Sequence, residues 1–415
     1  MEVKPITEAA FKQFEENYTG HMHYFHDELF YDYISNVNET HLLGLFDGDD
    51  LLGVSMLSAT SVLKKFRLFT SHTVPLIQDF SNERLKFFLE EIDQYAKSHG
   101  ALQMIHSPYT VYQMRDEDGN VAEDDPQNNR ELISLYEDLG YKHHGFTTEL
   151  ITEELLRFQA VIDVDKPLDD ILKQMDTTTR YNTRQTETMP LQLKLLDEDE
   201  YDKFIQIYKE TEERIGFDPV PAEKIKNLLN TLKDRMFLVL THVNVDDYLK
   251  QLEDERDIEL GHIAEIEEKA ANGTATKREK KRVNEHKEQL ASKDKRIKKM
   301  EEFKAEFGTE LDLSAGMYYY NNHEMVYLFS GSYPELSFFK GTNFATWEMI
   351  KKAQEIGVKR FNFFGLTGDF TENAQDYGVY RFKRGFTPYI EELPGTFDKV
   401  FNKPVYAIAK KLGKI

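Results

Sequence analysis

One stretch of the chain contains the residue types that acyl transfer to an amine needs. It consists of residues 330–333 (SGSY) and 338–343 (FFKGTN), which precede a segment with helical spacing that includes Trp347, the only tryptophan. Where a loop enters a helix, unpaired backbone amides and the helix dipole favour negative charge. Lys340 would add a mobile ammonium just before the expected helix. We therefore predict that this loop can stabilise the oxyanion of a tetrahedral intermediate.

Other interpretations of this stretch remain open. Lys340 could be a solvated loop lysine, and Phe339 could be a core aromatic residue. The acyl donor is also open, because acyl-CoA N-acyltransferases hold the CoA pyrophosphate with the pattern Gln/Arg-x-x-Gly-x-Gly/Ala. Residues 354–359 (QEIGVK) and 375–380 (QDYGVY) come closest to this pattern, and both fail at its last place. The sequence therefore argues against CoA, which stays as an alternative.

Composition excludes several kinds of chemistry. The 415 residues include no cysteine, which excludes disulfides and thiol catalysis and removes the commonest zinc ligand. His21, His23 and His26 cluster near the start, but a metal site would also need convergent geometry and further ligands. We therefore predict no metal and no other cofactor.

Charge and hydropathy limit the partners and the compartment. The formal net charge of −22 should repel nucleic acid, so any RNA contact must use local basic patches, and we expect no DNA contact. No run approaches 18 apolar residues, and residues 1–5 (MEVKP) lack a signal pattern. We therefore expect a cytoplasmic protein with no membrane span.

The spacing of apolar and turn residues predicts two units with a similar order of elements. In the first unit we expect helices at 82–99 and 132–139, and strands at 41–46, 51–57, 71–77 and 101–105. In the second we expect a helix starting at 167, further helices at 200–213, 222–231 and 343–357, and strands at 158–164, 236–241, 316–320, 325–330 and 360–364. Each unit has strands, then a helix, then a strand before a glycine-containing loop. We predict an α+β fold with two copies of one acyltransferase-like unit.

A long insertion, residues 246–307, interrupts the second unit. It contains two charged segments with helical spacing, joined by residues 270–275 (AANGTA). Apolar residues form a narrow stripe in each segment, at Leu249, Leu252, Leu260, Ile263 and Ile266, and at Val283, Leu290, Ile297, Met300, Phe303 and Phe307. Such a seam suits an antiparallel coiled coil, which at ~1.5 Å per residue forms an arm of roughly 40 Å.

The charges of the arm are segregated. Residues 246–269 contain ten acids and three bases, whereas residues 277–306 contain twelve bases and seven acids. One interpretation is that the two helices attract each other through opposite net charge. The other is that the basic tip binds RNA phosphates through Lys277, Arg278, Lys280, Lys281 and Arg282. The two interpretations are compatible.

Several stretches resemble one known family, namely residues 75–79, 180–184, 330–350, 361–368 and 378–386. With the arm, they make the chain similar over nearly its whole length to the Fem/MurM family of non-ribosomal peptidyltransferases. The resemblance implies two acetyltransferase-like (GNAT-like) domains with an antiparallel coiled-coil arm inserted in the second. It also implies transfer of an amino acid from aminoacyl-tRNA to the lipid-linked peptidoglycan precursor. The acceptor would be the stem-peptide lysine or the growing cross-bridge, and we expect alanine, with serine or glycine as alternatives.

The resemblance also assigns roles to residues. The catalytic Phe-Lys pair of the family matches Phe339 and Lys340, so Lys340 would stabilise the ester oxyanion or the leaving ribose. Arg180 and Arg184 match the precursor-phosphate site and, four apart on a helix, could clamp a diphosphate. A solvated helix face is the alternative for this pair. Further substrate-binding residues would be Tyr109, Tyr181, Tyr380 and Lys383.

Residues 107–109 (SPY) depart from the family pattern. Many relatives have Asp-Pro-Tyr at this place, so Ser107 leaves the chain without the usual carboxylate base. Assistance from the substrate or from solvent could replace that base, because the attacking amine needs only one deprotonation. Tyr109 could line the precursor cleft or pack in the core.

The C-terminal segment, residues 399–415, intersperses apolar side chains with Lys399, Lys403, Lys410, Lys411 and Lys414. A basic amphipathic helix can lie on an anionic membrane surface. Because the implied substrate is lipid-linked, we expect peripheral contact with the inner face of the plasma membrane. Packing of this segment against the first domain, with solvated lysines, is the alternative.

These patterns predict three parts of the chain. The first domain would comprise residues 1–148, with 391–415 packed on it. The second would comprise 149–245 and 308–390, and the arm 246–307. The predicted function is tRNA-dependent aminoacyl transfer. The alternatives are a CoA-dependent N-acyltransferase and a non-catalytic coiled-coil interaction protein.

Overall fold

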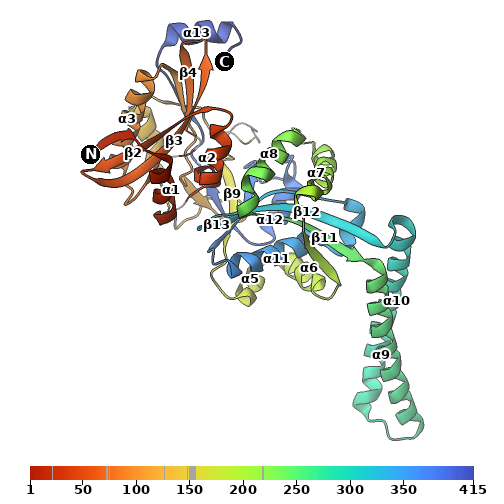
Figure 1. The fold of residues 1–415 in the computed structure, drawn as a ribbon. Helices are drawn as coiled ribbons and strands as arrows, with labels where there is room; N and C mark the ends of the chain where they lie inside the picture. Colours follow the sequence, from red (N-terminus) through yellow and green to blue (C-terminus); the bar gives the residue numbers. More distant parts are fainter. Residues whose placement is uncertain are drawn as a thin grey trace.

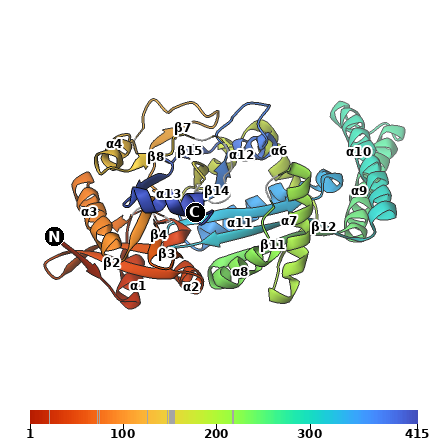
Figure 2. The ribbon, with the colours of Figure 1, turned by 90° about the horizontal axis from the view of Figure 1, so that it is seen from above.

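The chain is built around two mixed β-sheets, which lie side by side with helices packed on their faces (Figure 1). The computed structural model describes residues 1–20, 22–71, 73, 75–125, 127–146, 148, 156–216 and 219–415. Figure 2 shows the same molecule from above, with a helical hairpin projecting beyond the second sheet. The mixed α/β character and the helical arm that the sequence predicts are therefore present.

The first sheet has the strand order β1-β2-β3-β4-β6-β16-β8, with β5 paired to β3. Its strands are β1 (Glu2–Pro5), β2 (Glu39–Asp47), β3 (Asp50–Val62), β4 (Phe66–Ser71), β5 (Leu76–Ile77), β6 (Ala101–His106), β8 (Lys142–His143) and β16 (Phe397–Val400). Its helices are α1 (Glu8–Asn17), α2 (Glu28–Ser35), α3 (Asn82–Ser98) and α4 (Glu131–Asp138). Strands β4 and β6 run parallel because α3 crosses between them. The predicted face of α3 is buried at Leu85, Phe88, Leu89 and Ile92.

One predicted strand of this sheet is wrong. Instead of a strand over 71–77, the chain forms β4, which ends at Ser71, and the separate short strand β5. Thr73 and Pro75 lie outside both strands, and a proline cannot donate a hydrogen bond to a sheet. Pairing partners, rather than local spacing, decide where each strand ends.

The second sheet has the strand order β10-β11-β12-β13-β14-β9-β15-β7. Its strands are β7 (Gln113–Arg115), β9 (Phe158–Asp163), β10 (Leu191–Leu195), β11 (Met236–Asn244), β12 (Glu310–Tyr320), β13 (Glu324–Ser332), β14 (Arg360–Leu366) and β15 (Tyr389–Glu392). One face is covered by α7 (Tyr201–Ile215) and α8 (Ala222–Leu232), and the other by α5 (Leu168–Gln174), α6 (Thr177–Thr186) and α11 (Gly341–Glu355) (Figure 1). A short helix, α12 (Tyr377–Arg384), lies beside β14.

Both sheets contain the same strand–helix–strand unit. In the first it is β4–α3–β6, and in the second it is β13–α11–β14, where the two strands are again parallel. However, β13 and β14 pair only where Glu324–Val326 meets Arg360–Asn362, and they separate beyond that point. The chain then leaves β13 toward Lys340 and leaves β14 toward a glycine-containing loop, residues 365–368.

The two halves exchange strands. Strand β7, from the first half of the chain, pairs with β15 in the second sheet, and β16, from the C-terminal end, pairs with β6 in the first. The predicted boundary at 148/149 does not describe this exchange, because residues 113–115 belong to the second sheet. The two units are consequently joined by backbone hydrogen bonds and not only by side-chain packing.

The arm consists of α9 (Val245–Ala271) and α10 (Lys277–Phe307), which pack against each other between the adjacent strands β11 and β12. Thr276 and Glu279 form a capping box that starts α10. At its base, Leu252, Met300 and Phe303 are buried with residues of the second sheet. The predicted seam is wrong at Leu260 and at Phe307, whose side chains are 43% and 36% exposed.

The opposite charges of the two arm helices meet in ion pairs. Lys287 pairs with Glu267 at 2.8 Å, Lys304 with Asp246 at 2.6 Å, and Lys293 with Glu255. Each pair joins the acidic helix α9 to the basic helix α10. The attraction between the helices that the charge segregation predicts is therefore part of the structure.

The last helix, α13 (Lys403–Lys411), packs on β6 at the end of the molecule farthest from the arm (Figure 1). Ala409 is buried against Leu102, whereas Ile408 and Leu412 are 55% and 58% exposed. Among the described residues, no helix is both long enough and apolar enough to cross a membrane.

Candidate active site

Lys340 occupies the junction that the sequence predicts. It is the residue before α11 and has left-handed backbone angles, φ 56° and ψ 37°. Residues other than glycine rarely adopt these angles. Gly341 follows where a Cβ would lie 2.8 Å from the Leu313 side chain of β12, so only glycine fits this close approach. The hydroxyl of Thr241 also donates to the Gly341 carbonyl. The strained turn is thus held against the sheet.

The surroundings of the Lys340 side chain support a catalytic role less well than its position before a helix does. Its side chain is half-buried, and within the described part of the chain its ammonium has no ion-pair partner. Phe339 is 0% exposed and packs 5.1 Å from the ring of Phe303 on α10. A side chain so enclosed cannot touch a substrate in this conformation. Phe339 therefore anchors the base of the arm, in agreement with its interpretation as a core aromatic residue.

Helix α6 carries the predicted phosphate-binding arginines on its solvent side. Thr179, Thr183 and Thr186 are buried, whereas Tyr181 is 62% exposed, Arg184 is exposed and Arg180 is half-buried. This pattern places the two arginines and Tyr181 on accessible parts of one helix. The Arg180 guanidinium donates to the Lys173 carbonyl at 3.2 Å.

Helix α6 also connects two regions of the second unit. At its start, the Asp176 amide donates to the Gly385 carbonyl, just after α12. Beyond its end, Gln251 of α9 donates to the Thr188 carbonyl, and Trp347 of α11 donates to Glu187. The exposed side chains of α6 therefore lie between α12 and the base of the arm.

Lys383 is the predicted site residue with the most unusual environment. It is buried on α12, and its ammonium donates to the Gly365 carbonyl at 2.6 Å. Burial lowers the pKa of Lys383 from its usual 10.5 to about 7, and the nearby Asp376 carboxylate opposes that shift only partly. A lysine that can be either charged or neutral near neutral pH is typical of functional sites.

The loop that receives this hydrogen bond is tightly fixed. Asp376, itself buried, accepts hydrogen bonds from the amide and the hydroxyl of Thr367. Gly368 has a φ of 86°, and a Cβ there would lie 2.1 Å from the Phe158 ring. The loop at 365–368 is therefore held by α12 on one side and by β9 on the other.

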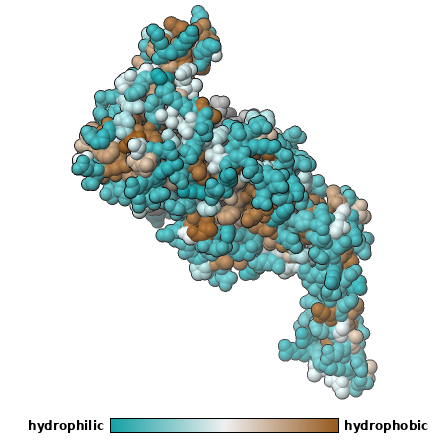
Figure 3. Space-filling model, viewed as in Figure 1, coloured by the Kyte–Doolittle hydropathy of each residue, from teal (hydrophilic) through white to brown (hydrophobic). Residues whose placement is uncertain are grey.

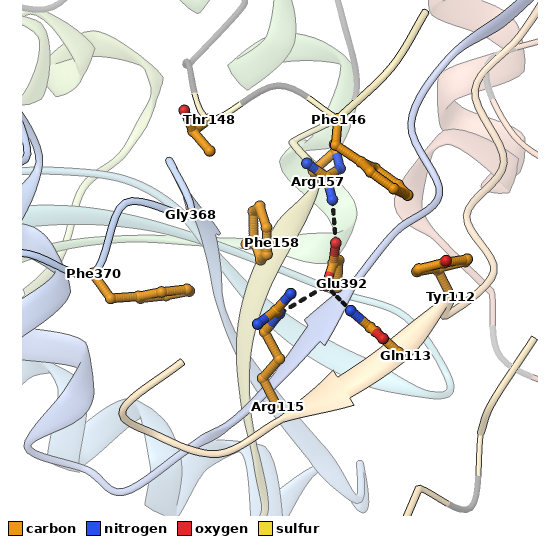
Figure 4. A pocket seen from close by; sticks show the side chains of 10 residues that line it. All are labelled: Tyr112, Gln113, Arg115, Phe146, Thr148, Arg157, Phe158, Gly368, Phe370 and Glu392. Atoms are coloured by element: carbon orange, nitrogen blue, oxygen red, sulfur yellow. Dashed lines mark hydrogen bonds and ion pairs between the residues drawn. The ribbon is translucent and has the colours of Figure 1, made fainter. Parts of the chain in front are cut away.

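A cavity of about 310 Å³ lies beside this loop (Figure 4). Its polar centre is Glu392, which accepts hydrogen bonds from Gln113 at 2.6 Å and Arg115 at 2.7 Å and also binds Arg157. The remaining lining residues are Tyr112, Phe146, Thr148, Phe158, Gly368 and Phe370. The cavity thus combines aromatic walls with two guanidinium groups that share one carboxylate.

A second cavity of similar size shares Phe370 with the first and lies against α12. It is lined by Asp118, Phe370, Thr371, Glu372, Tyr377, Tyr380, Arg381 and Arg384. Tyr380 is mostly buried, and its hydroxyl donates to the Glu117 carbonyl. Tyr380 lines the second cavity, whereas neither Lys383 nor Lys340 lines either one. Lys383 is connected to the first cavity through its hydrogen bond to Gly365, in the loop whose Gly368 lines that cavity.

Tyr109 does not line an open cleft as one of the predictions proposed. It is buried, its hydroxyl donates to Gln159 at 2.9 Å, and its ring packs 4.2 Å from His23. Asn362 joins the same network by donating to Gln159 and to Glu324. Burial raises the pKa of Glu324 to about 7, but this carboxyl is fully enclosed, so it is out of reach of a substrate amine. Glu324 therefore does not replace the carboxylate base that Ser107 leaves out.

His23 and His26, two of the three histidines near the start of the chain, make separate contacts. His23 packs against Tyr109, and His26 forms a hydrogen bond with Thr73. His21 lies outside the described residues.

Sequence reasoning missed the residues at the centre of the cavity. Arg115 and Arg157 come from segments without a motif. Glu391 and Glu392 gave one usable signal, because two adjacent carboxylates in a short strand that is otherwise apolar must find partners when they are buried. Glu391 does so with Arg360 at 2.9 Å, and Glu392 with the two cavity arginines.

Comparison with known proteins agrees with this architecture. The FemAB family model matches residues 6–414. The aminoacyltransferase FemA of Staphylococcus aureus (strain MW2) is 33% identical over 383 residues, which cover 91% of this chain and 90% of that protein. The crystal structure of FemX matches the fold with a TM-score of 0.79 at 20% sequence identity, over 98% of this chain and 99% of that one. The chain therefore belongs to the FemAB family and is a transferase.

Proposed function

We propose that this protein transfers an amino acid from aminoacyl-tRNA to the lipid-linked peptidoglycan precursor. The acceptor is the amine of the stem-peptide lysine or of the growing cross-bridge, and we expect the transferred residue to be alanine, with serine or glycine as alternatives. The similarity to aminoacyltransferase FemA along 91% of the chain supports aminoacyl transfer. The family resemblance of the sequence supports the acceptor.

The observation that carries the chemistry is the buried Lys383, whose ammonium donates to the 365–368 loop at the edge of a cavity. In the reaction, the acceptor amine attacks the ester carbonyl, a C–N bond forms, and the C–O bond to the tRNA ribose breaks. The intermediate carries an oxyanion, and the ribose oxygen must gain a proton as it leaves. An ammonium in a site with little water stabilises such charge strongly.

Lys383 suits both tasks because its pKa is lowered to about 7. Its protonated form can donate to the oxyanion in place of the Gly365 carbonyl, and it can release a proton to the leaving ribose more readily than an ordinary lysine. The amine loses its own proton to the substrate or to solvent. We therefore propose Lys383 as the catalytic lysine, in preference to Lys340.

The neighbouring surfaces suit the two substrates. The aromatic walls of the cavity can receive a ribose or a base, and its guanidiniums Arg115 and Arg157 can bind phosphate. We place the acceptor end of the tRNA there. Arg180 and Arg184, exposed on the adjacent helix α6, remain the proposed site of the precursor diphosphate, with Tyr181 beside them.

The arm has a proposed role in tRNA binding. Lys277, Arg278, Lys280, Lys281 and Arg282 are all exposed at its tip. In the described residues none of the five is part of an ion pair, in contrast to Lys287, Lys293 and Lys304 farther along α10. These five cations are available to RNA phosphates, and the strained turn at Lys340 and the buried Phe339 fix the arm that carries them. The proposed packing of α9 and α10 is that of an antiparallel coiled coil.

The opposite end of the molecule has a proposed role at the membrane. Figure 3 shows hydrophobic and hydrophilic residues side by side where α13 lies. Ile408 and Leu412 are exposed next to Lys411, whereas Lys399 is taken up by an ion pair with Asp93 at 2.5 Å. We expect the double variant Ile408→Asp, Leu412→Asp to reduce sedimentation with anionic vesicles. Equal sedimentation of both proteins would contradict this contact.

The function is tested by the mass of the product. The protein is incubated with the lipid-linked precursor and a mixture of charged tRNAs, and in parallel with the precursor and acetyl-CoA. We expect the precursor to gain the mass of one aminoacyl group in the first reaction only. Gain of an acetyl group would support the CoA alternative, and no gain in either reaction would contradict the proposed transfer.

A further inference from the structure

The apolar seam of the arm is interrupted at one level by polar residues from both helices. On α9, Leu252 and Ile266 are buried and lie fourteen residues apart, and Glu259 occupies the seam position midway between them. On α10, His286 lies between the half-buried Val283 and Leu290. A polar residue in such a seam costs stability unless it has a partner.

The polar side chains at this level converge. The Nδ1 atom of His286 lies 2.6 Å from a carboxylate oxygen of Glu259, and both side chains are largely buried, with 13% and 14% exposed. The imidazole of His262, one turn after Glu259 on the same face of α9, lies 4.9 Å from that of His286, centroid to centroid. One potential ligand atom from each residue lies within 4.8 Å of the other two.

This donor set has a defined chemistry. Two imidazoles and one carboxylate are ligands that zinc and similar divalent transition metals accept, whereas magnesium and calcium prefer oxygen ligands alone. Three protein ligands leave one position for water. Because Glu259 and His262 belong to α9 and His286 belongs to α10, a bound ion would join the two helices halfway along the arm.

We infer that Glu259, His262 and His286 form a binding site for a divalent transition metal such as zinc. The ion bridges α9 and α10 and restricts their movement at the point where the apolar seam is weakest. This site is remote from the cavity and is independent of the proposed transfer reaction. It departs from the expectation, based on the sequence, of a chain without metal, because that expectation considered only the histidines near the start.

The test uses zinc alone with the full chain. Isothermal titration calorimetry measures stoichiometry and affinity for the wild type, for His262→Ala and for His286→Leu, in which leucine completes the seam and keeps the arm folded without a ligand. His99→Ala is the matched control, since His99 is exposed on the first unit. We expect one zinc ion per chain for the wild type and the control, and affinity reduced by more than about tenfold in both arm variants.

Hydrogen exchange locates the effect. With zinc, amides of residues 255–266 and 283–290 should exchange more slowly in the wild type and at an unchanged rate in His262→Ala. Absence of zinc binding to the wild type would overturn the inference and leave Glu259 and His286 as an ion pair. Equal affinity in the arm variants would overturn it as well, by showing that zinc binds elsewhere.

Discussion

Two lysines of the second unit, Lys340 and Lys383, differ in backbone conformation and in burial. Lys340 follows β13, has a strained backbone and a half-buried side chain, and adjoins the base of the arm. Lys383 packs against the loop after β14, has an ordinary helical backbone, and is buried with a pKa lowered to about 7. A backbone outlier identifies a position that the fold must control, whereas a buried ionisable group beside a cavity identifies chemistry.

The largest expected effect is the difference in transfer rate when each of the two lysines is replaced by methionine. Lys383→Met should reduce the transfer rate by about 10²–10³-fold, because it removes the only proposed charge donor to the oxyanion. Lys340→Met should reduce it by less than about tenfold, through the geometry of the arm. Single-turnover rates with saturating charged tRNA provide the measurement. A reversed order of the two effects would return the catalytic role to Lys340.

The next effect tests the structural role of the region around Lys340. Phe339→Ala should lower the free energy of unfolding by about 3–5 kcal/mol, because it leaves a cavity at the base of the arm. Phe307→Ala, on an exposed site of α10, is the control and should change it by about 0.5 kcal/mol or less. Urea denaturation measures both variants. If Phe339→Ala is as stable as its control, the anchoring role is wrong.

The third prediction concerns the titration of the Lys383 side chain. Because burial lowers the pKa of Lys383 to about 7, its ammonium is present below that pH and is lost as the pH rises through it. In protein with ¹³C-labelled lysine, one side-chain signal should titrate near pH 7, and it should be absent from Lys383→Met. The contribution of Lys383 to the transfer rate should decline over the same range. If every lysine signal titrates above pH 9, the lowered pKa proposed for Lys383 is wrong.

The smallest effect concerns the arm tip. Replacement of Lys280, Lys281 and Arg282 by Glu should weaken tRNA binding. The slope of log K against the logarithm of the salt concentration should become shallower by about two, because each phosphate that is no longer neutralised removes roughly 0.7 from it. The control is the replacement of Lys64, Lys65 and Lys86 by Glu. These three lysines are exposed on the first unit, and their replacement changes the net charge by the same amount. Equal affinities of the two triple variants would mean that the tip does not contact RNA.

Local patterns in the sequence predicted the elements that local forces determine. The helix over 82–99, the turn between β2 and β3, the two arm helices and a helix starting next to Lys340 all depend on apolar period, turn residues or capping. Their observed bounds lie within a few residues of the predicted ones.

Features that depend on distant partners were mostly missed. Residues 391–415 were expected on the first unit, where β16 does lie, but the pairing of β7 with β15 crosses more than 250 residues, which no local period records. The cavity likewise unites Arg115, Arg157 and Glu392 from three separate segments. Lys340 stands out in the sequence more than Lys383 for the same reason, because the first has a recognisable loop–helix context and the second becomes unusual only through burial.

The proposed roles of the two lysines depend on where acyl transfer occurs, beside Lys383 or at the base of the arm. A crystal structure of the protein with an aminoacyl dinucleotide, in which an amide replaces the reactive ester, locates the reacting carbonyl directly. We predict that the amide carbonyl oxygen lies within hydrogen-bond distance of the Lys383 ammonium, with the terminal ribose in the cavity of Arg115, Arg157 and Glu392. An amide carbonyl bound to the Lys340 ammonium, with that cavity empty, would contradict transfer beside Lys383.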